Sequence, residues 1–291
     1  MTDEATCRQI DKIVDRALEG AGLKEPPFMI EDLLEYLDVN RDFYDLEDVR
    51  LLRRFWHKVK VRGRRLVNIA RKISLHAVWL PDDDQILVDS SIPAPKQEWA
   101  SFHDAVHTIV EWHRPYFLGD TAQTLDPDFQ EMLEGEANYG ASALMFGGKK
   151  IFAKEALDTS PEWASIQLLK KRYKKSYVTT VRRYVQFSHD IPMVIVISTP
   201  WWEEKPDDQK DRCRHFVPSR KFGSLFACIS PEIVLEQVDN NTYQRTGGPV
   251  GQFGLSLPDI NGDLNEFYAE SFYNRHYVLT LLVYQGKLKY F

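Results

Sequence analysis

The most informative segment of the chain is Ser101-Phe102-His103-Asp104-Ala105-Val106-His107. It lies in a run from about Lys96 to Trp112 whose apolar residues recur at helical spacing. Two histidines four residues apart on a helix project from one face, one turn above the other. Neutral imidazoles in this arrangement can fill two corners of a tetrahedral metal site. The segment therefore predicts a helix with a metal-binding histidine pair, although packed helix histidines without metal remain an alternative.

Asp104 directly follows the first histidine. In the HExxH motif of zinc peptidases, this position holds the glutamate that acts as general base. Aspartate is shorter by one methylene, roughly 1.5 Å of reach. A shift of ~1 Å in a catalytic group can reduce the rate about a hundredfold. Three outcomes stay open: an active enzyme, a slow enzyme, and a zinc-binding scaffold that does not cleave.

A third ligand is expected from the next helix, predicted over 128–146, which contains Glu134-Gly135-Glu136-Ala137-Asn138. Glu134 and Asn138 are four residues apart, so both can face the histidine helix. Glu134 can complete a His2Glu site with an open fourth position, and Asn138 can support a liganding histidine from behind. Glu136 is an alternative ligand. The competing interpretation treats both glutamates as surface acids.

His113 is a further alternative ligand. With His103 and His107 it stands at relative positions 0, 4 and 10, the spacing of the HExxHxxGxxH motif. That motif needs a glycine to turn the chain back toward the metal, and Val110 occupies this position. We therefore expect the helix to continue and carry His113 in another direction, and we prefer Glu134 as the third ligand.

The order of these features resembles the ImmA/IrrE family of zinc metallopeptidases, over about residues 5–185. The segments that carry the resemblance are an N-terminal helix over 4–22, Gly22-Leu23-Lys24-Glu25-Pro26-Pro27, Ile30-Glu31-Asp32-Leu33-Leu34, Ile86-Leu87-Val88-Asp89-Ser90-Ser91-Ile92-Pro93, Trp99 to His107 for the family's F-x-x-AHELGH, and Glu134 to Met145 for its E-x-E-A-N-x-x-A-x-x-L-M. Two departures lie in the helix: Asp104 replaces the usual glutamate, and Val106 replaces the usual glycine.

The resemblance implies an α+β fold: a mainly helical zincin-like core with a small sheet (1–158), a helix-turn-helix-like segment (159–188) and a C-terminal α+β regulatory domain (189–291), for which a GAF-like sensor is one candidate. It implies a zinc endopeptidase that cleaves a helix-turn-helix transcriptional repressor in a stress response, with Asp104 as base. The His2Glu set also tolerates Mn²⁺ or Fe²⁺. The alternative function is a non-catalytic zinc-binding module that binds a protein or DNA partner.

Composition restricts the remaining classes of function. The 291 residues carry a net charge of −6, and direct DNA binding through the basic residues of 161–187 is not expected. The acidic start lacks the pattern of a signal peptide, and no apolar run reaches the ~18 residues of a membrane span. Three scattered cysteines predict no disulfide framework, so we expect a reduced, cytoplasmic protein without a membrane partner. Oligomeric state is not determined by the sequence.

The spacing of apolar residues predicts helices and strands along the whole chain. Helices are expected over 4–22, 30–37, 96–112, 128–146 and, as a pair, within 161–187, and strands over 76–80, 85–88, 193–198, 226–229 and 278–284. Beyond about residue 190, strand-like runs alternate with polar loops, which marks the best candidate for a domain boundary.

Overall fold

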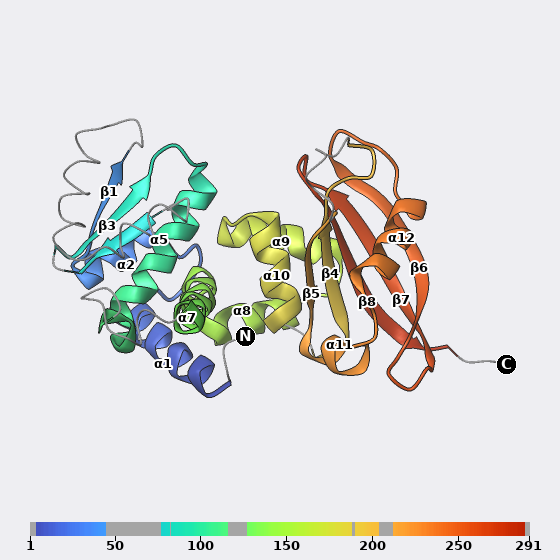
Figure 1. The fold of residues 1–291 in the computed structure, drawn as a ribbon, viewed down its shortest axis with the longest axis horizontal. Helices are drawn as coiled ribbons and strands as arrows, with labels where there is room; N and C mark the ends of the chain where they lie inside the picture. Colours follow the sequence, from blue (N-terminus) through green and yellow to red (C-terminus); the bar gives the residue numbers. More distant parts are fainter. Residues whose placement is uncertain are drawn as a thin grey trace. The chain divides into compact units, whose positions relative to one another are not determined.

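The computed structural model describes residues 4–44, 77–81, 83–115, 127–187, 190–203 and 212–288. Its contacts divide the chain into two compact units, Met1–Ile151 and Phe152–Phe291. Helices and two separate sheets occur in the described residues, which confirms the predicted α+β class (Figure 1). The predicted three-part division of the chain stays a prediction. Among the described residues, no helix combines the length and the apolar character needed to cross a membrane.

The first unit contains a three-stranded sheet of order β1-β3-β2, formed by β1 (Asn40–Tyr44), β2 (Ala77–Leu80) and β3 (Gln85–Asp89). Strand β3 pairs in parallel with β1 and antiparallel with β2. Asp84 ends the turn between β2 and β3 with a φ of 43°, a left-handed conformation that Asp adopts more readily than most residues. The two predicted strands are confirmed, whereas the mostly exposed β1 was not predicted because it lacks apolar alternation.

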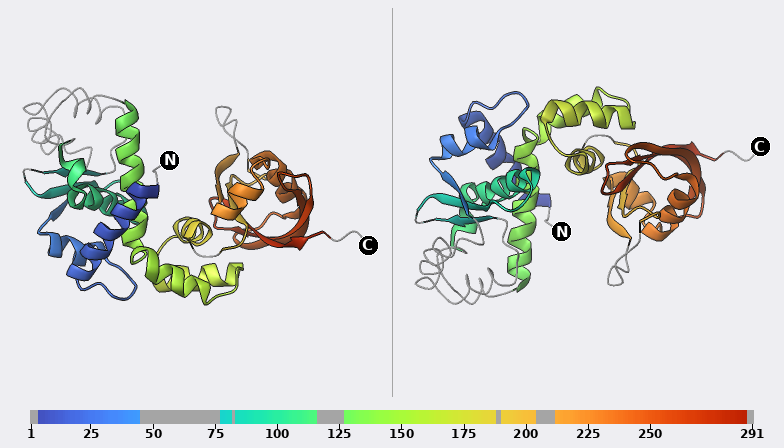
Figure 2. Two further views of the ribbon diagram at one scale, coloured as in Figure 1. Left: turned by 90° about the horizontal axis from the view of Figure 1, so that it is seen from below. Right: turned by 90° about the horizontal axis from the view of Figure 1, so that it is seen from above.

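The described residues of the first unit also form six helical segments. They are α1 (Glu4–Gly20), α2 (Ile30–Leu37), α5 (Ala94–Ile109), the 3-10 turn η1 (Glu111–His113), α7 (Pro127–Met145) and α8 (Gly148–Leu157), which continues into the second unit. Helix α5 packs on the sheet and against α7, and α7 also contacts α1 (Figure 2). A Cβ at Gly140 of α7 would lie 2.8 Å from both methyl carbons of Val106. Glycine at this position therefore allows α7 to lie close to α5.

The histidine helix ends earlier than the sequence predicted. Helix α5 stops at Ile109, and Val110 adopts an extended conformation with φ −91° and ψ 101° before η1 begins. The prediction that the helix continues past Val110 was wrong. A valine is sufficient here because the break uses extended backbone, which β-branched residues adopt readily, and needs no positive φ.

Two glycines separate α7 from α8. Gly147 and Gly148 have φ values of 72° and 77°, in the region that favours glycine. They end α7 as predicted, but Gly148 also begins α8, a helix that the sequence reading did not include.

The second unit is built on a five-stranded antiparallel sheet of order β5-β4-β8-β7-β6. Its elements are α9 (Trp163–Tyr173), α10 (Tyr177–Phe187), β4 (Met193–Ser198), β5 (Cys213–Pro218), α11 (Arg220–Leu225), α12 (Pro231–Asn241), β6 (Gly248–Pro258), β7 (Leu264–Tyr273) and β8 (Val278–Lys287). Helices α10 and α12 both pack on β4, and every residue of β4 is buried. A continuous apolar strand is typical of such two-sided burial.

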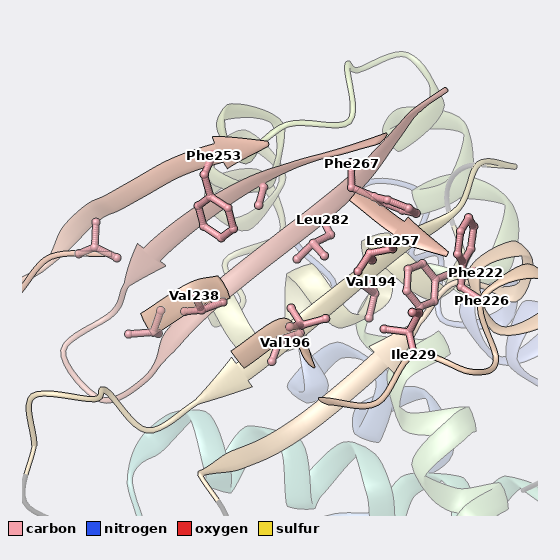
Figure 3. Packing of buried hydrophobic residues seen from close by; sticks show 14 of the residues in the cluster. Val194, Val196, Phe222, Phe226, Ile229, Val238, Phe253, Leu257, Phe267 and Leu282 are labelled. Atoms are coloured by element: carbon pink, nitrogen blue, oxygen red, sulfur yellow. The ribbon is translucent and has the colours of Figure 1, made fainter. Parts of the chain in front are cut away.

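An apolar cluster fills the space between the sheet and helices α11 and α12 (Figure 3). The ring centroid of Phe226 lies 5.1 Å from that of Phe222 and 5.0 Å from that of Phe267. The predicted strand over 226–229 was wrong: the segment is a turn between α11 and α12. Phe226 and Ile229 anchor this turn in the cluster, whereas Cys228 is exposed. The apolar residues that suggested a strand therefore serve to anchor a turn.

Candidate metal centre

Three side chains from α5 and α7 converge on one point. His103 Nε2 lies 3.0 Å from Glu134 Oε2 and 3.2 Å from His107 Nε2, and His107 Nε2 lies 3.9 Å from Glu134 Oε1. One ligand atom from each residue can be chosen so that all lie within 4.8 Å of one another. Within the described part of the chain, this is the only such group of three or more His, Cys, Asp or Glu residues. The two helices thus bring together the three residues that the sequence singled out as ligands.

Asn138 lies behind His103, one helical turn after Glu134. The Nδ1 atom of His103 is 3.1 Å from Asn138 Oδ1. A carbonyl oxygen accepts, so this contact holds the ring proton on Nδ1 and leaves the lone pair on Nε2, toward Glu134. This is the placement that the spacing of Glu134 and Asn138 indicated.

His113 also returns to the centre, contrary to expectation, but it lies behind the ligand set. Its Nδ1 atom is 2.8 Å from His107 Nδ1, on the opposite side of that ring from Glu134. The extended conformation of Val110 redirects the chain, so that η1 places His113 beside α5. His113 is fully buried and is not a member of the ligand cluster.

Glu136 was the other alternative ligand, and the structure places it away from the cluster. Its Oε2 atom accepts a hydrogen bond from Trp112 Nε1 at 2.7 Å and lies 3.0 Å from His113 Nε2. Residues two apart on a helix do not share a face, so only one of Glu134 and Glu136 can face the histidine pair. Trp112 is a member of the site that sequence reasoning missed. Its position directly before His113 was the only available signal.

Asp104 is buried beside the three residues. Its Oδ2 atom has no hydrogen-bond partner among the residues that the structure describes. Burial raises the pKa of the Asp104 carboxyl to about 7, the charge of His103 opposes this and Glu134 adds to it. The pKa of Tyr44, at the end of β1, is raised to about 12 by burial and by the carboxylates of Asp89 and Asp104. Asp104 therefore lies in a poorly solvated environment where it can hold a proton near neutral pH.

The two histidines of the pair differ in their electrostatics. Burial lowers the pKa of His107 well below the usual value, and the neighbouring His103 and His113 act in the same direction. Burial also disfavours the charge on His103, but the hydrogen bond to Glu134 and the nearby carboxylates outweigh it and raise its pKa. When no ion lies between them, a proton on His103 Nε2 can bridge to Glu134.

Three basic residues of α9 and α10 are buried or contact other residues of the second unit. Arg183 is buried, and Arg172 Nε pairs with Glu155 Oε2 at 2.7 Å. The ammonium of Lys170 lies over the ring of Tyr177, 4.7 Å from its centroid. These three side chains are therefore buried or in contact with other residues of the same chain.

Comparison with known proteins gives a likeness of fold. No protein-family model and no curated protein sequence matches the chain. A solved structure described as a Mycobacterium tuberculosis transcriptional regulator is similar with a TM-score of 0.54 and 12% identity, over 95% of this chain and 88% of the other. At this identity the match concerns the fold alone.

Proposed function

We propose that the protein is a zinc-dependent endopeptidase similar to the ImmA/IrrE family. The observation that carries the proposal is the convergence of His103, His107 and Glu134, with the buried carboxyl group of Asp104 beside the two histidines on α5. The site is built as a His2Glu set on two packed helices, and catalytic zinc is commonly held by three protein ligands of these types.

The donor chemistry fits a divalent cation. Two imidazole Nε2 atoms 3.2 Å apart and a carboxylate oxygen 3.0 Å from one of them present lone pairs to the same region. Like lone pairs at this separation repel one another, and a cation between them replaces the repulsion by attraction. Neutral imidazole and carboxylate oxygen are ligands that Zn²⁺ accepts, as do Mn²⁺ and Fe²⁺.

When bound, the ion supplies Lewis acidity, which acidifies water and polarises a carbonyl group. The protein side chains then have separate tasks. His103, His107 and Glu134 hold the ion, and Asn138 orients His103 from behind. Asp104 holds and moves the proton as general base, a role that suits a carboxyl whose pKa lies near neutral pH.

The substrate that we propose is a regulatory protein, of the helix-turn-helix repressor class that the family resemblance implies. The distant fold likeness to a transcriptional regulator supports a role in transcription regulation. The engagement of Arg172, Arg183 and Lys170 within the second unit is more compatible with a protein partner than with direct DNA contact.

A second candidate function is a zinc-binding regulatory module without peptidase activity. The observation that favours it is Asp104 itself, because the shorter side chain reaches less far than the glutamate of HExxH. Both candidates need the metal, so metal content is tested first. We expect about one zinc per chain in the wild type and none retained by His107→Ala, measured by elemental analysis after dialysis. His276→Ala, an exposed loop histidine, is the matched control. Equal zinc in both variants contradicts the metal centre.

Cleavage separates the two candidates. The zinc-loaded protein is incubated with candidate repressors encoded nearby, with and without a chelator, and fragments are identified by mass spectrometry. For the peptidase, Asp104→Asn abolishes cleavage while zinc stays bound, and Asp104→Glu preserves or raises the rate. Asp32→Asn, on an exposed face of α2, should cleave like the wild type. If no protein form cleaves a repressor that it demonstrably binds, the regulatory module is the better description.

A further inference from the structure

A chain of buried polar groups extends from His107 away from the candidate ligands. His107 Nδ1 contacts His113 Nδ1 at 2.8 Å, and His113 Nε2 contacts Glu136 Oε2 at 3.0 Å. The exposed fractions of His107, His113 and Glu136 are 1%, 0% and 3%. Three titratable residues buried in one chain are expensive to desolvate, so their hydrogen bonds must be mutually compatible.

The direction of each hydrogen bond follows from Glu136, the last residue of this hydrogen-bonded series. Glu136 as a carboxylate can only accept, and Trp112 Nε1 can only donate to it. His113 must therefore donate to Glu136 from Nε2. A neutral His113 then has its lone pair on Nδ1, so His107 must donate from its own Nδ1. The remaining nitrogen of His107, Nε2, is left with a lone pair directed toward His103 and Glu134.

We propose that Glu136 and His113 are positioning residues that fix the tautomer and ring orientation of His107 for metal binding. The inference rests on the proposed metal centre but adds residues that hold a ligand without touching the ion. Partners of this kind raise the basicity of a liganding imidazole and limit its rotation. Trp112 supports the arrangement by holding Glu136 in place through its indole N–H.

The two ligand histidines are thus supported unequally. His103 is held by Asn138, whose side chain is exposed, whereas His107 is held by a buried chain that ends in a carboxylate. A hydrogen bond that competes with water is weaker in effect than one in a buried, charge-assisted network. Disruption of the buried chain should therefore weaken metal binding more than Asn138→Ala does.

The first test needs no metal. In the metal-free full-length protein with ¹⁵N-labelled histidine, long-range ¹H–¹⁵N spectra report which ring nitrogen carries the proton. We expect His107 protonated on Nδ1 and His113 protonated on Nε2, with assignments from His107→Ala and His113→Phe. His107 protonated on Nε2, or His113 protonated on Nδ1, overturns the inference.

The second test measures zinc affinity by competition with a chromophoric chelator. His113→Phe keeps an aromatic ring of similar size but removes both nitrogens, and we expect a dissociation constant about 10–100-fold higher. His113→Gln offers one donor and one acceptor and should recover most of this loss. Glu136→Gln can keep the accepting oxygen but loses the charge, so a smaller weakening, roughly tenfold, is expected. Glu131→Gln, exposed on the same helix, is the control.

The outcomes distinguish the two levels of the proposal. If the wild type binds no zinc, the proposed metal centre fails, while the tautomer measurement still decides whether the buried chain exists. If the wild type binds zinc and folded His113→Phe and Glu136→Gln bind it as tightly, the positioning role is wrong and the metal centre stands. Should His113→Phe not fold, as judged by circular dichroism, Glu136→Gln and the metal-free spectra decide.

Discussion

The interior between α5 and α7 contains several buried polar side chains, whereas the interior between the sheet of the second unit and helices α11 and α12 is apolar. Between the helices, Asp104, His107, His113 and Glu136 are all buried. Behind the sheet, the cluster around Phe222 consists of aliphatic and aromatic side chains (Figure 3). Burial of apolar surface stabilises a fold by about 25 cal/mol per Å², whereas each buried polar group reduces stability unless a partner compensates it.

The difference indicates what each interior contributes. The apolar cluster can be understood from stability alone. The polar interior cannot, because apolar residues of similar volume are often neutral or stabilising in place of buried charged groups. In the arrangement of protons proposed above, its hydrogen bonds direct lone pairs toward the point between His103, His107 and Glu134, whose ligand atoms lie within 4.8 Å of one another. This is the expected signature of a site retained for binding or catalysis.

The largest effect on stability is expected in the apolar interior. Phe222→Ala removes a ring with 1% exposure that contacts Phe226 and Phe267, and should lower the free energy of unfolding by about 3–5 kcal/mol. Phe222→Leu, which keeps most of the volume, should lower it by less than about 1.5 kcal/mol. Urea unfolding followed by circular dichroism measures both. Zinc affinity of the folded variants should not change, and a parallel loss would contradict the separation of the two interiors.

Zinc should stabilise the polar interior selectively. At a free zinc concentration a hundredfold above the dissociation constant, the expected gain is about 2.7 kcal/mol. Hydrogen exchange should then slow in the amides of α5 and α7 but not in those of β7 and β8. His107→Ala should abolish the effect, and His276→Ala should leave it intact. Equal slowing in both units would show that they open together and would remove the contrast.

A smaller effect is expected at the contact between α5 and α7. Gly140→Ala places a Cβ 2.8 Å from the Val106 methyl carbons and 3.3 Å from Ile10 Cγ2. Overpacking lowers the free energy of unfolding by about 1–3 kcal/mol, and the better helix propensity of alanine offsets up to about 1 kcal/mol of this loss. We expect a net loss of about 1–2 kcal/mol together with weaker zinc binding, because α7 carries Glu134.

A smaller side chain at Val106 provides the control for this prediction. The double variant Gly140→Ala/Val106→Ala relieves the close contact, so it should lose less stability than the sum of the single variants, which a double-mutant cycle measures. Additive losses would show that the helices adjust in another way.

The smallest effect is expected at the start of α11. Ser219 Oγ accepts hydrogen bonds from the backbone N–H groups of Phe222 at 3.2 Å and Met193 at 2.9 Å. Ser219→Ala should therefore lower stability by about 1 kcal/mol, the usual value for a lost helix cap. Ser230, at the start of α12, makes no capping bond, so Ser230→Ala should change the unfolding midpoint less. An equal shift in the two variants would contradict the role of Ser219 as a cap.

Local patterns identified the helices that carry the candidate ligands. The spacing of His103 and His107 and of Glu134 and Asn138 placed each pair on one helical face, since a helix repeats every 3.6 residues wherever it lies. Several regular elements were not predicted. Two of them have weak patterns, because β1 is mostly exposed and α11 has only six residues. The others that were missed are α8, α12, β5, β6 and β7. At 226–229 a strand was predicted where none forms, because Phe226 and Ile229 are apolar for packing in the cluster and not for a place in the sheet.

The place of His113 could not be read from spacing. The sequence predicted a continuous helix because no glycine stands at Val110, yet extended backbone at one valine was sufficient to turn the chain. Whether such a turn forms depends on what it buries, here His113 against His107 and Trp112 against Glu136. The contacts of Trp112 and His113 with Glu136 join residues 24 and 23 positions apart along the chain, and local propensity does not contain them.

Sequence alone determined which side chains share a helical face, and hence that two histidines on one helix and a carboxylate on the next could serve one cation. Only the tertiary structure decided that α5 and α7 lie close enough for these side chains to meet, with Gly140 against Val106. It also decided that Glu134 faces the histidines while Glu136 faces His113. The physical reason is that periodicity is a property of one helix, whereas the distance and rotation between two helices are set by the packing of both.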